Sequence, residues 1–267
     1  MKLFIIEYII SLNKALVNSE IIEYPENICN YNESDLFVYF GISYVNYKLL
    51  NKPNIYLVNL EQLTIDGTHS DYNMLKHVLD IHRNYPLISL LDYSMANSKI
   101  LEKYNIVSRY LPYQVNESEI YNYEKQYDYV MCCSYNERTN RIYSKLAELY
   151  NKHVFIGRPC LWGSDRDNIL LRSKILMNVH HREFDYNILE EIRITRCILN
   201  KVIVISEDSQ NKDLYPLSKY VLFCKYEDLV STCTDVLNNY EKYYKEIYND
   251  FNIELADKLF KSYIIKE

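Results

Sequence analysis

The chain has 267 residues, of which 48% are hydrophobic and 25% are charged, and its formal net charge at pH 7 is -6. This balance is typical of a folded globular protein and excludes an intrinsically disordered chain. The negative charge, and the lack of any run rich in Lys and Arg, argue against nucleic acid as a partner, because nucleic acid needs a continuous basic surface.

Two features of the composition are unusual: 29 Tyr residues and four Gly residues. The tyrosines are spread through the chain, which favours the coding bias of an AT-rich genome over a tyrosine-based binding surface. The seven Cys residues are scattered, with an adjacent pair at Cys132 and Cys133 and no Cys-x-x-Cys spacing. An odd number of Cys without a framework predicts a reducing compartment.

The first residues do not read as a targeting signal. Met1–Leu12 is apolar, but Glu7 interrupts it, a small-residue cleavage pattern is lacking, and the stretch is too short to span a bilayer. We therefore expect a cytoplasmic protein without a membrane span, located in the host cytoplasm if the source is viral.

Alternating strands and helices are predicted in the first half, because short apolar runs are followed by stretches of helical periodicity. Met1–Val17 fits either a strand followed by a helix or a single helix. The predicted strands are Asp35–Phe40, Ile55–Leu60, Leu87–Leu91 and Ile106–Tyr110. The predicted helices lie around Tyr44–Leu50, Tyr72–His82 and Ala96–Tyr104.

A polar stretch, Val115–Gln126, has no buried face of its own and is the predicted linker. Beyond it, strands and helices alternate with short connections, which is typical of a doubly wound parallel sheet. The predicted strands are Asp128–Cys133, His153–Ile156, Ile175–Val179, Val202–Ser206 and Val221–Cys224. The predicted helices are Arg138–Tyr150, Asp165–Ser173, Asn187–Leu199 and Glu227–Asn239, followed by a helical tail, Tyr240–Ile265.

The predicted fold is α/β, with two Rossmann-like lobes that face a cleft and with parallel sheets flanked by helices. Residues 1–122 form the first lobe and residues 123–267 form the second, whose C-terminal helix is able to cross back to the first. Ligands bind at the carboxyl ends of the strands in such sheets, so the strand-to-helix loops should carry the function.

The loop after Asp128–Cys133 reads Ser-Tyr-Asn-Glu-Arg. It places Ser134 and Asn136 at a helix N-terminus, where backbone N–H groups and the helix dipole favour an anion such as a diphosphate. Arg138 adds a guanidinium fork that suits phosphate oxygens. Simple helix capping by Ser134 or Asn136, with Arg138 in solvent, explains the same residues.

Polar residues also interrupt the predicted strand Ile175–Val179 near its carboxyl end. Asn178 lies in the strand, and His180 and His181 follow it directly. A strand interior has little reason to carry Asn and His there unless they line a cleft, although one His fits a structural role equally well. Metal binding is not expected, because a second cluster of ligands with the necessary spacing is lacking.

Glu183 and Glu191 stand eight positions apart, with Glu190 beside the second. A carboxylate in the first turn of a helix whose end faces a cleft can accept both hydroxyls of a ribose. A salt bridge from Glu190 to Arg193, at helix-neighbour spacing, is the alternative.

Several motifs with a known mechanism do not occur in the sequence: Gly-x-Gly-x-x-Gly, Gly-x-x-x-x-Gly-Lys-Ser/Thr, Gly-x-Ser-x-Gly and His-Glu-x-x-His. Their absence argues against dinucleotide oxidoreductases, P-loop enzymes, serine hydrolases and zinc proteases.

Taken in order, these segments resemble glycosyltransferases of the GT-B fold, in particular the bacterial and viral sequences related to the retaining, EX7E-containing families. The similar segments in the second half are CSYNER, RSKILMNVH, ILEEIRI, KVIVISE and YEDL. Those in the first half are YLVNLEQL, LLDYSMANSKIL and YLPY. The chain departs from these families in lacking a Gly-rich loop near its start and in carrying Arg182-Glu183-Phe184 where Glu-Gly-Phe-Gly is usual.

The resemblance implies a glycosyltransferase of hexosyltransferase type that uses a UDP- or GDP-sugar as donor, needs no cofactor or metal, and retains the anomeric configuration. The diphosphate would be held by Arg138, Lys174 and the helix turn after Ser134, and the ribose by Glu190 or Glu191. The implied catalytic residues are Arg138, Lys174, His180 and Glu183. The implied donor-binding residues are Ser134, Asn136, Gly157, Asn178, Glu190 and Glu191, and the expected acceptor-side residues are Glu61, Asp92 and Ser94.

Three other readings stay open at the level of the sequence. A protein of GT-B-like fold can bind a nucleotide or sugar without turnover, can be a sugar epimerase, or can be a structural protein whose cleft is filled. The acceptor of a transferase would be a glycan, a protein or a small molecule.

Overall fold

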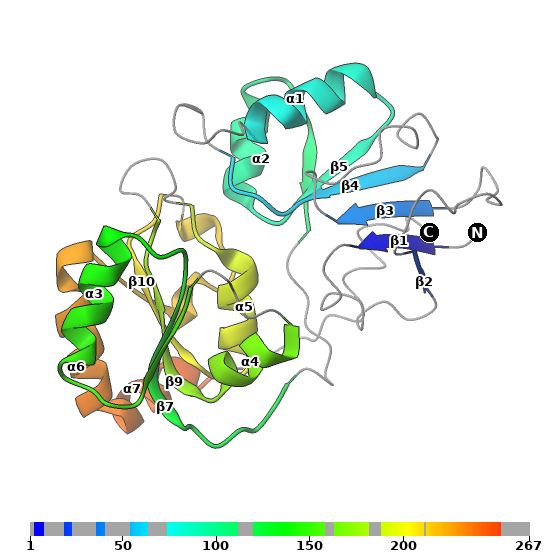
Figure 1. The fold of residues 1–267 in the computed structure, drawn as a ribbon. Helices are drawn as coiled ribbons and strands as arrows, with labels where there is room; N and C mark the ends of the chain where they lie inside the picture. Colours follow the sequence, from blue (N-terminus) through cyan, green and yellow to red (C-terminus); the bar gives the residue numbers. More distant parts are fainter. Residues whose placement is uncertain are drawn as a thin grey trace. The chain divides into compact units, whose positions relative to one another are not determined.

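The computed structural model describes residues 3–7, 19–22, 36–40, 54–63, 74–111, 120–157, 163–181, 188–210 and 212–251. The chain divides into two compact units, each built on one parallel sheet (Figure 1). Within the described ranges, none of the helices is long and apolar enough to cross a membrane.

The described strands of the first unit form a six-stranded sheet in the order β2-β1-β3-β4-β5-β6, and all its pairs are parallel. The strands are β1 Leu3–Glu7, β2 Ser19–Ile22, β3 Leu36–Phe40, β4 Ile55–Asn59, β5 Ser89–Asp92 and β6 Ser108–Tyr110. The helices are α1 Met74–Asn84 and α2 Met95–Glu102.

The core of the first unit comes from buried strand residues and from one face of α1. Ile55 and Leu57 of β4 are almost fully buried. Leu75, Val78 and Ile81 recur every three residues along α1 and are its buried side chains, so the helix presents a single apolar stripe to the sheet.

The second unit contains a five-stranded parallel sheet in the order β11-β10-β9-β7-β8. Its strands are β7 Tyr127–Cys132, β8 His153–Ile156, β9 Ser173–Asn178, β10 Ile203–Glu207 and β11 Val221–Cys224. Its helices are α3 Glu137–Ala147, α4 Gly163–Leu171, α5 Glu191–Leu199, α6 Leu229–Asn238 and α7 Tyr240–Tyr248, and a 3-10 turn, η8 Tyr226–Asp228, precedes α6.

Helices cover both faces of the second sheet. α3 and α6 pack together on one face, and α4 and α5 cover the other (Figure 1). Strands buried on both faces must be almost continuously apolar, as the runs in β9 and β10 are. This is the doubly wound arrangement that the sequence predicts.

The α/β class, with two parallel sheets flanked by helices, is therefore confirmed. The predicted strand at Leu87–Leu91 begins later, at Ser89, because Leu87 is 72% exposed and does not join the core. The predicted helix Tyr44–Leu50, and the tail beyond residue 251, lie outside the described residues. Met1–Val17 was compatible with a strand followed by a helix or with a single helix, and its residues 3–7 form a strand. The cleft between the lobes stays a prediction.

The predicted linker is the main correction to the organisation. Residues 120–126 have no regular structure, but they run along the second unit instead of lying free of both. The N–H of Tyr121 donates to Asn200 Oδ1 at 2.7 Å, and the N–H of Gln126 donates to the carbonyl of Arg172 at 2.7 Å. The predicted boundary between residues 122 and 123 thus falls inside a segment that contacts the second unit.

Among the described residues, three other than glycine adopt the left-handed backbone conformation: Asn54, Asn105 and Lys201, with φ of 59°, 58° and 53°. Each lies in the turn that leads into a strand of one of the two sheets. In a chain with four glycines, asparagine and lysine occupy positions that favour glycine.

We expect Leu176→Ala to lower the free energy of unfolding by about 2–5 kcal/mol, because it removes a fully buried side chain from the central strand β9 and leaves a cavity. Leu149→Ala is the matched control: Leu149 is 58% exposed and its loss should change stability by less than about 0.5 kcal/mol. Urea unfolding followed by circular dichroism measures both. Equal effects would contradict the assignment of the core.

Candidate functional site

The strand order of the second sheet locates the candidate site. β7 and β9 are adjacent, and the chain continues outward from them in opposite directions, to β8 on one side and to β10 and β11 on the other. In doubly wound sheets, ligands bind outside the carboxyl ends of the strands at this switch point. The loops there follow Cys132 and Asn178, and Glu207 ends the neighbouring β10.

An ion pair between Arg138 of α3 and Glu207 of β10 spans this edge of the sheet. Arg138 Nη1 donates to Glu207 Oε2 at 2.7 Å, and Nη2 donates to Oε1. The guanidinium carbon lies 3.9 Å from the ring centroid of Tyr226. The two charged side chains are only 18% and 10% exposed, so the alternative that leaves Arg138 in solvent is wrong.

Glu207 also fixes the loop after β9. Its Oε2 accepts the backbone N–H of His180 at 3.2 Å, and the carbonyl of His180 accepts a hydrogen bond from Arg138 Nη1 at 3.1 Å. One carboxylate therefore connects α3, β10 and the loop after β9. Glu207 is not among the predicted site residues, although an acidic residue at the carboxyl end of a predicted buried strand is the same signal that pointed to Asn178.

Two of the five N–H groups of the Arg138 guanidinium form no hydrogen bond with the described residues. The bonds to Glu207 and His180 use three of its five N–H groups. The Nε–H and the second N–H of Nη2 are parallel and form the other fork. A phosphate or carboxylate suits this geometry.

His180 is buried, with 4% of its surface exposed. Burial lowers the pKa of His180, and the nearby charge of Glu207 opposes this effect without cancelling it. Its Nε2 lies 3.0 Å from Ser209 Oγ, which orients the ring. The lowered pKa favours the neutral imidazole, and direct contact between His180 and a ligand stays a prediction.

Asn178 lies at the carboxyl end of β9, as predicted, and is buried. Its Nδ2 donates to Ser206 Oγ at 2.9 Å, and its Oδ1 accepts from Arg193 Nη1 at 3.3 Å. The amide thus couples β9 to β10 and orients Arg193 of α5. Direct contact between Asn178 and a ligand stays a prediction.

Asn136 is the N-cap of α3. Its side chain accepts the N–H of Thr139 at 2.8 Å, and Thr139 Oγ1 accepts the N–H of Asn136 at 3.0 Å, which forms a capping box. Asn136 Nδ2 also donates to the carbonyl of His181 at 2.8 Å, and the carbonyl of Ser134 accepts from Thr139 Oγ1 at 3.0 Å. Capping is therefore the observed role of Asn136, and anion binding at this turn stays a prediction.

Glu190 and Glu191 begin α5 at the same edge. Glu190 Oε2 lies 3.9 Å from Arg193 Nη2, the helix-neighbour pair given above as the alternative to ribose binding. The side chain of Glu190 is 39% exposed, whereas Glu191 is 4% exposed. Glu190 is accordingly the better placed of the two to meet a ligand.

Lys174 does not join this cluster. It is the second residue of β9 and pairs with Asp128 of β7 at 2.9 Å, at the amino end of the sheet. Four residues farther on, Asn178 lies at the other edge, about 13 Å away at the rise of a parallel strand. A contact of Lys174 with the diphosphate that Arg138 would bind does not fit this fold. The predicted strand started at Ile175, which left Lys174 in a loop.

Gly157 follows β8 at the carboxyl edge, and a Cβ there would lie 2.7 Å from the ring of Phe155, so a larger residue would require that ring to move. Contact of Gly157 with a donor stays a prediction. Glu183 lies outside the described residues. In the described part of the chain, no three His, Cys, Asp or Glu side chains are grouped as metal ligands.

On the first unit, Asp92 and Ser94 are fully buried, so they form no open acceptor wall of the kind expected. Asp92 Oδ2 accepts from Asn59 Nδ2 at 2.8 Å, and its Oδ1 accepts from the N–H of Ser94 and from Asn97 Nδ2, both at 2.9 Å. This network joins the carboxyl ends of β4 and β5. Glu61 is exposed beside it, and its carbonyl accepts from Asn97 Nδ2 at 2.9 Å.

The two parallel sheets flanked by helices belong to the GT-B class of α/β fold, and solved GT-B glycosyltransferases are similar to this chain. The crystal structure of TarM has a TM-score of 0.57, with 10% identity over 87% of this chain and 54% of TarM. A S. aureus TarM variant in complex with fondaparinux, alpha-GlcNAc-glycerol and UDP has a TM-score of 0.53, with 10% identity over 88% of this chain and 56% of the other. At such low identity the likeness concerns the fold.

No family model matches the sequence. Uncharacterized protein L140 of Acanthamoeba polyphaga mimivirus is 30% identical over 226 residues, which is 80% of this chain and 69% of that protein. The chain belongs to the same family as L140. Uncharacterized protein L137 of the same virus is 31% identical over 98% of this chain, but the chain spans only 35% of the length of L137.

Asp92 should make the first unit less stable as the pH rises. Burial raises the pKa of Asp92 from 3.8 to about 7, even though its three N–H donors act in the opposite direction. The folded state therefore holds the proton more tightly, and stability should fall between about pH 4 and pH 7, by up to about 4 kcal/mol, and level off above.

Hydrogen exchange of the peptides that cover β5, measured between pH 4 and pH 8 and corrected for intrinsic exchange, tests this expectation. Asp92→Asn removes the titrating group at constant size and should flatten the dependence over this range, whatever its effect on stability at one pH. An unchanged slope in the variant would show that other groups cause it.

Proposed function

We propose that the protein transfers a hexosyl group from a nucleotide-diphosphate sugar to an acceptor, with the donor bound at the carboxyl edge of the second sheet. The observation that carries this proposal is the guanidinium of Arg138, which Glu207 fixes at the switch point of the sheet with one fork left for a ligand. The GT-B fold supports it, because TarM shares that fold and has been crystallised with UDP.

The proposed role of Arg138 follows from the chemistry of the leaving group. Negative charge grows on the diphosphate as the glycosidic bond breaks, and a cation held in place beforehand stabilises that charge without reorganisation. The side chains of Arg138 and Glu207 are largely buried. Water therefore screens the attraction between the guanidinium and the diphosphate less, which strengthens that attraction. A metal ion is not required for this step in the proposal.

Other residues of the edge would orient the donor. Glu190, at the first turn of α5, would accept the hydroxyls of the ribose, and neutral His180 would hydrogen-bond the sugar or its phosphates. Asn178 would act through Arg193, whose side chain it positions. We further propose that the transfer retains the anomeric configuration of the sugar. The support for this is the order of the motifs, which resembles that of the retaining families.

Arg138→Ala should weaken binding of a UDP- or GDP-sugar about 10- to 100-fold, the range expected for lost charge-assisted hydrogen bonds. Glu190→Ala should weaken it about 3- to 10-fold, because an exposed carboxylate that binds two hydroxyls contributes less. Isothermal titration calorimetry with both donors measures the affinities.

Arg141→Ala is the matched control. Arg141 lies one turn after Arg138 on α3, its side chain is 59% exposed, and its partner is Glu137 of the same helix. Its removal should leave the affinity unchanged. Unchanged affinity in both Arg138→Ala and Glu190→Ala would overturn the site assignment. Binding without sugar transfer, hydrolysis or epimerisation would instead identify a non-catalytic nucleotide-sugar-binding protein.

A further inference from the structure

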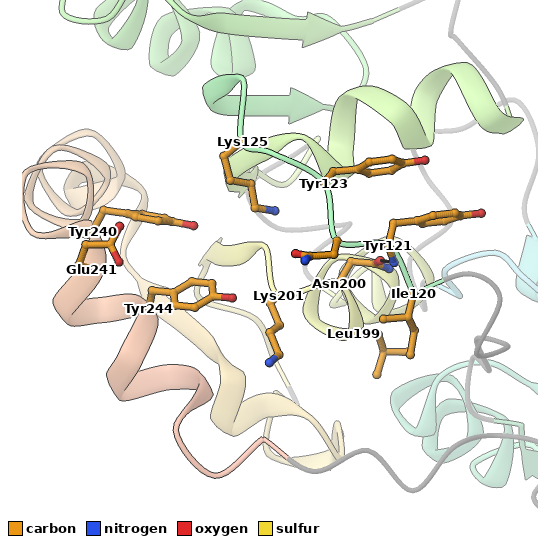
Figure 2. Close-up of a pocket in the computed structure, with 11 residues that line it drawn as sticks. Ile120, Tyr121, Tyr123, Lys125, Leu199, Asn200, Lys201, Tyr240, Glu241 and Tyr244 are labelled. Atoms are coloured by element: carbon orange, nitrogen blue, oxygen red, sulfur yellow. Dashed lines mark hydrogen bonds between the residues drawn. The ribbon is translucent and has the colours of Figure 1, made fainter.

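A concave site lies in the second unit, at the edge of the sheet opposite the proposed donor site. The segment before β7, the end of α5 and the start of α7 enclose a pocket of about 530 Å³ (Figure 2). This volume is in the range of small-molecule sites. We call it the tyrosine-lysine pocket after Tyr121, Tyr123, Lys125, Lys201, Tyr240 and Tyr244, which are among its lining residues.

The pocket is separate from the proposed donor site. Lys125 precedes the first residue of β7 by two positions, and Lys201 precedes the first residue of β10 by two. Both therefore lie at the amino ends of strands whose carboxyl ends lead to Arg138 and Glu207. Strands of five and six residues place the two edges roughly 15–20 Å apart.

Polar groups from three segments meet in the pocket. Figure 2 shows the ammonium of Lys125 and the hydroxyls of Tyr240 and Tyr244 directed toward its interior. Lys125 Nζ donates to the carbonyl of Leu171 at 2.9 Å, a neutral partner that leaves the positive charge uncompensated. Burial lowers the pKa of Lys125 to about 8, which reflects how poorly water solvates this ammonium. An anion placed here would gain a cation in a site of low polarity.

Lys201 adds a second cation at a backbone position that disfavours it. Its φ of 53° is left-handed, a conformation that glycine or asparagine adopts at lower energy. The turn closes the C-terminus of α5, where the N–H groups of Lys201 and Val202 each donate to a carbonyl of the last helical turn at 2.9 Å. Glu241, which also lines the pocket, brings a carboxylate that can accept hydroxyl groups.

We propose that the tyrosine-lysine pocket binds a small organic anion: a phosphate or carboxylate group attached to a hydroxylated body about the size of one sugar. Lys125 binds the anionic group together with the hydroxyls of Tyr240 and Tyr244, and Lys201, whose ammonium is directed away from that of Lys125 in Figure 2, adds positive charge to the lining. The rings of Tyr240 and Tyr244 pack against the carbon body, and Glu241 accepts its hydroxyls. The proposal does not depend on the proposed transferase activity, since it uses different residues at a different edge.

Ligand-observed NMR titration of the full chain tests the pocket with glucose 6-phosphate and glucuronate as probes. Both should bind with a Kd of about 1 mM or tighter, and glucose and inorganic phosphate should each bind about tenfold more weakly, because each supplies half of the contacts. Lys125→Gln should weaken glucose 6-phosphate about tenfold, and Tyr244→Phe about threefold.

Two controls separate binding from folding and from the donor site. Lys201→Asn removes the ammonium but keeps a residue suited to the left-handed turn, so it should fold normally and still weaken binding. Arg138→Ala should leave glucose 6-phosphate binding unchanged. The proposal is overturned if neither acid binds, if inorganic phosphate binds as tightly as glucose 6-phosphate, or if Lys201→Asn and Tyr244→Phe both bind like the unsubstituted protein. None of these results bears on the binding of a UDP-sugar.

Discussion

The ion pair between Arg138 and Glu207 is the constraint on which the candidate donor site depends. It joins residues that are 69 positions apart, and its carboxylate also holds the backbone of the loop after β9. A partly buried pair of this kind gains little net stability, because desolvation of both charges offsets their attraction. Its effect is geometric: it fixes where the remaining fork of Arg138 points.

Other charges at this edge of the sheet are also balanced by a partner or removed by burial. Glu190 lies near Arg193, and His180 is neutral because of its burial. Among the described residues these pairs leave little net charge near Arg138, and we expect recognition of a diphosphate there to depend on the placement of N–H groups more than on an excess of cations. The tyrosine-lysine pocket differs in this respect, because the carbonyl that meets Lys125 does not cancel its charge. One sheet thus carries two edges of different electrostatic character.

The sequence predicts the strands of the second sheet well, since a strand buried on both faces must be apolar along its length and ends where polar residues begin. Asn178 and His180 were found by that rule, and the rule also applies to Glu207. The pairing of Glu207 with Arg138 could not be predicted, because it depends on the order of the strands in the sheet, which periodicity does not reveal.

The predicted position of Lys174 is wrong for a related reason. Moving the start of β9 by two residues transfers a side chain from a loop to the amino edge. The polar composition of residues 120–126 predicts a linker, because only Tyr121, Tyr123 and Lys125 are half-buried and they alternate with exposed residues.

The scarcity of glycine has a consequence for how the sheets assemble. Asn54, Asn105 and Lys201 make the left-handed turns that lead into strands of the two sheets. A residue with a Cβ at such a turn costs energy in the native state, yet it samples far fewer backbone conformations than glycine when the chain is unfolded. The chain therefore loses less conformational entropy when it forms each of these turns than it would with glycine there. At Asn105 and Lys201, which follow α2 and α5, the connection from helix to strand is therefore restricted by the local backbone itself.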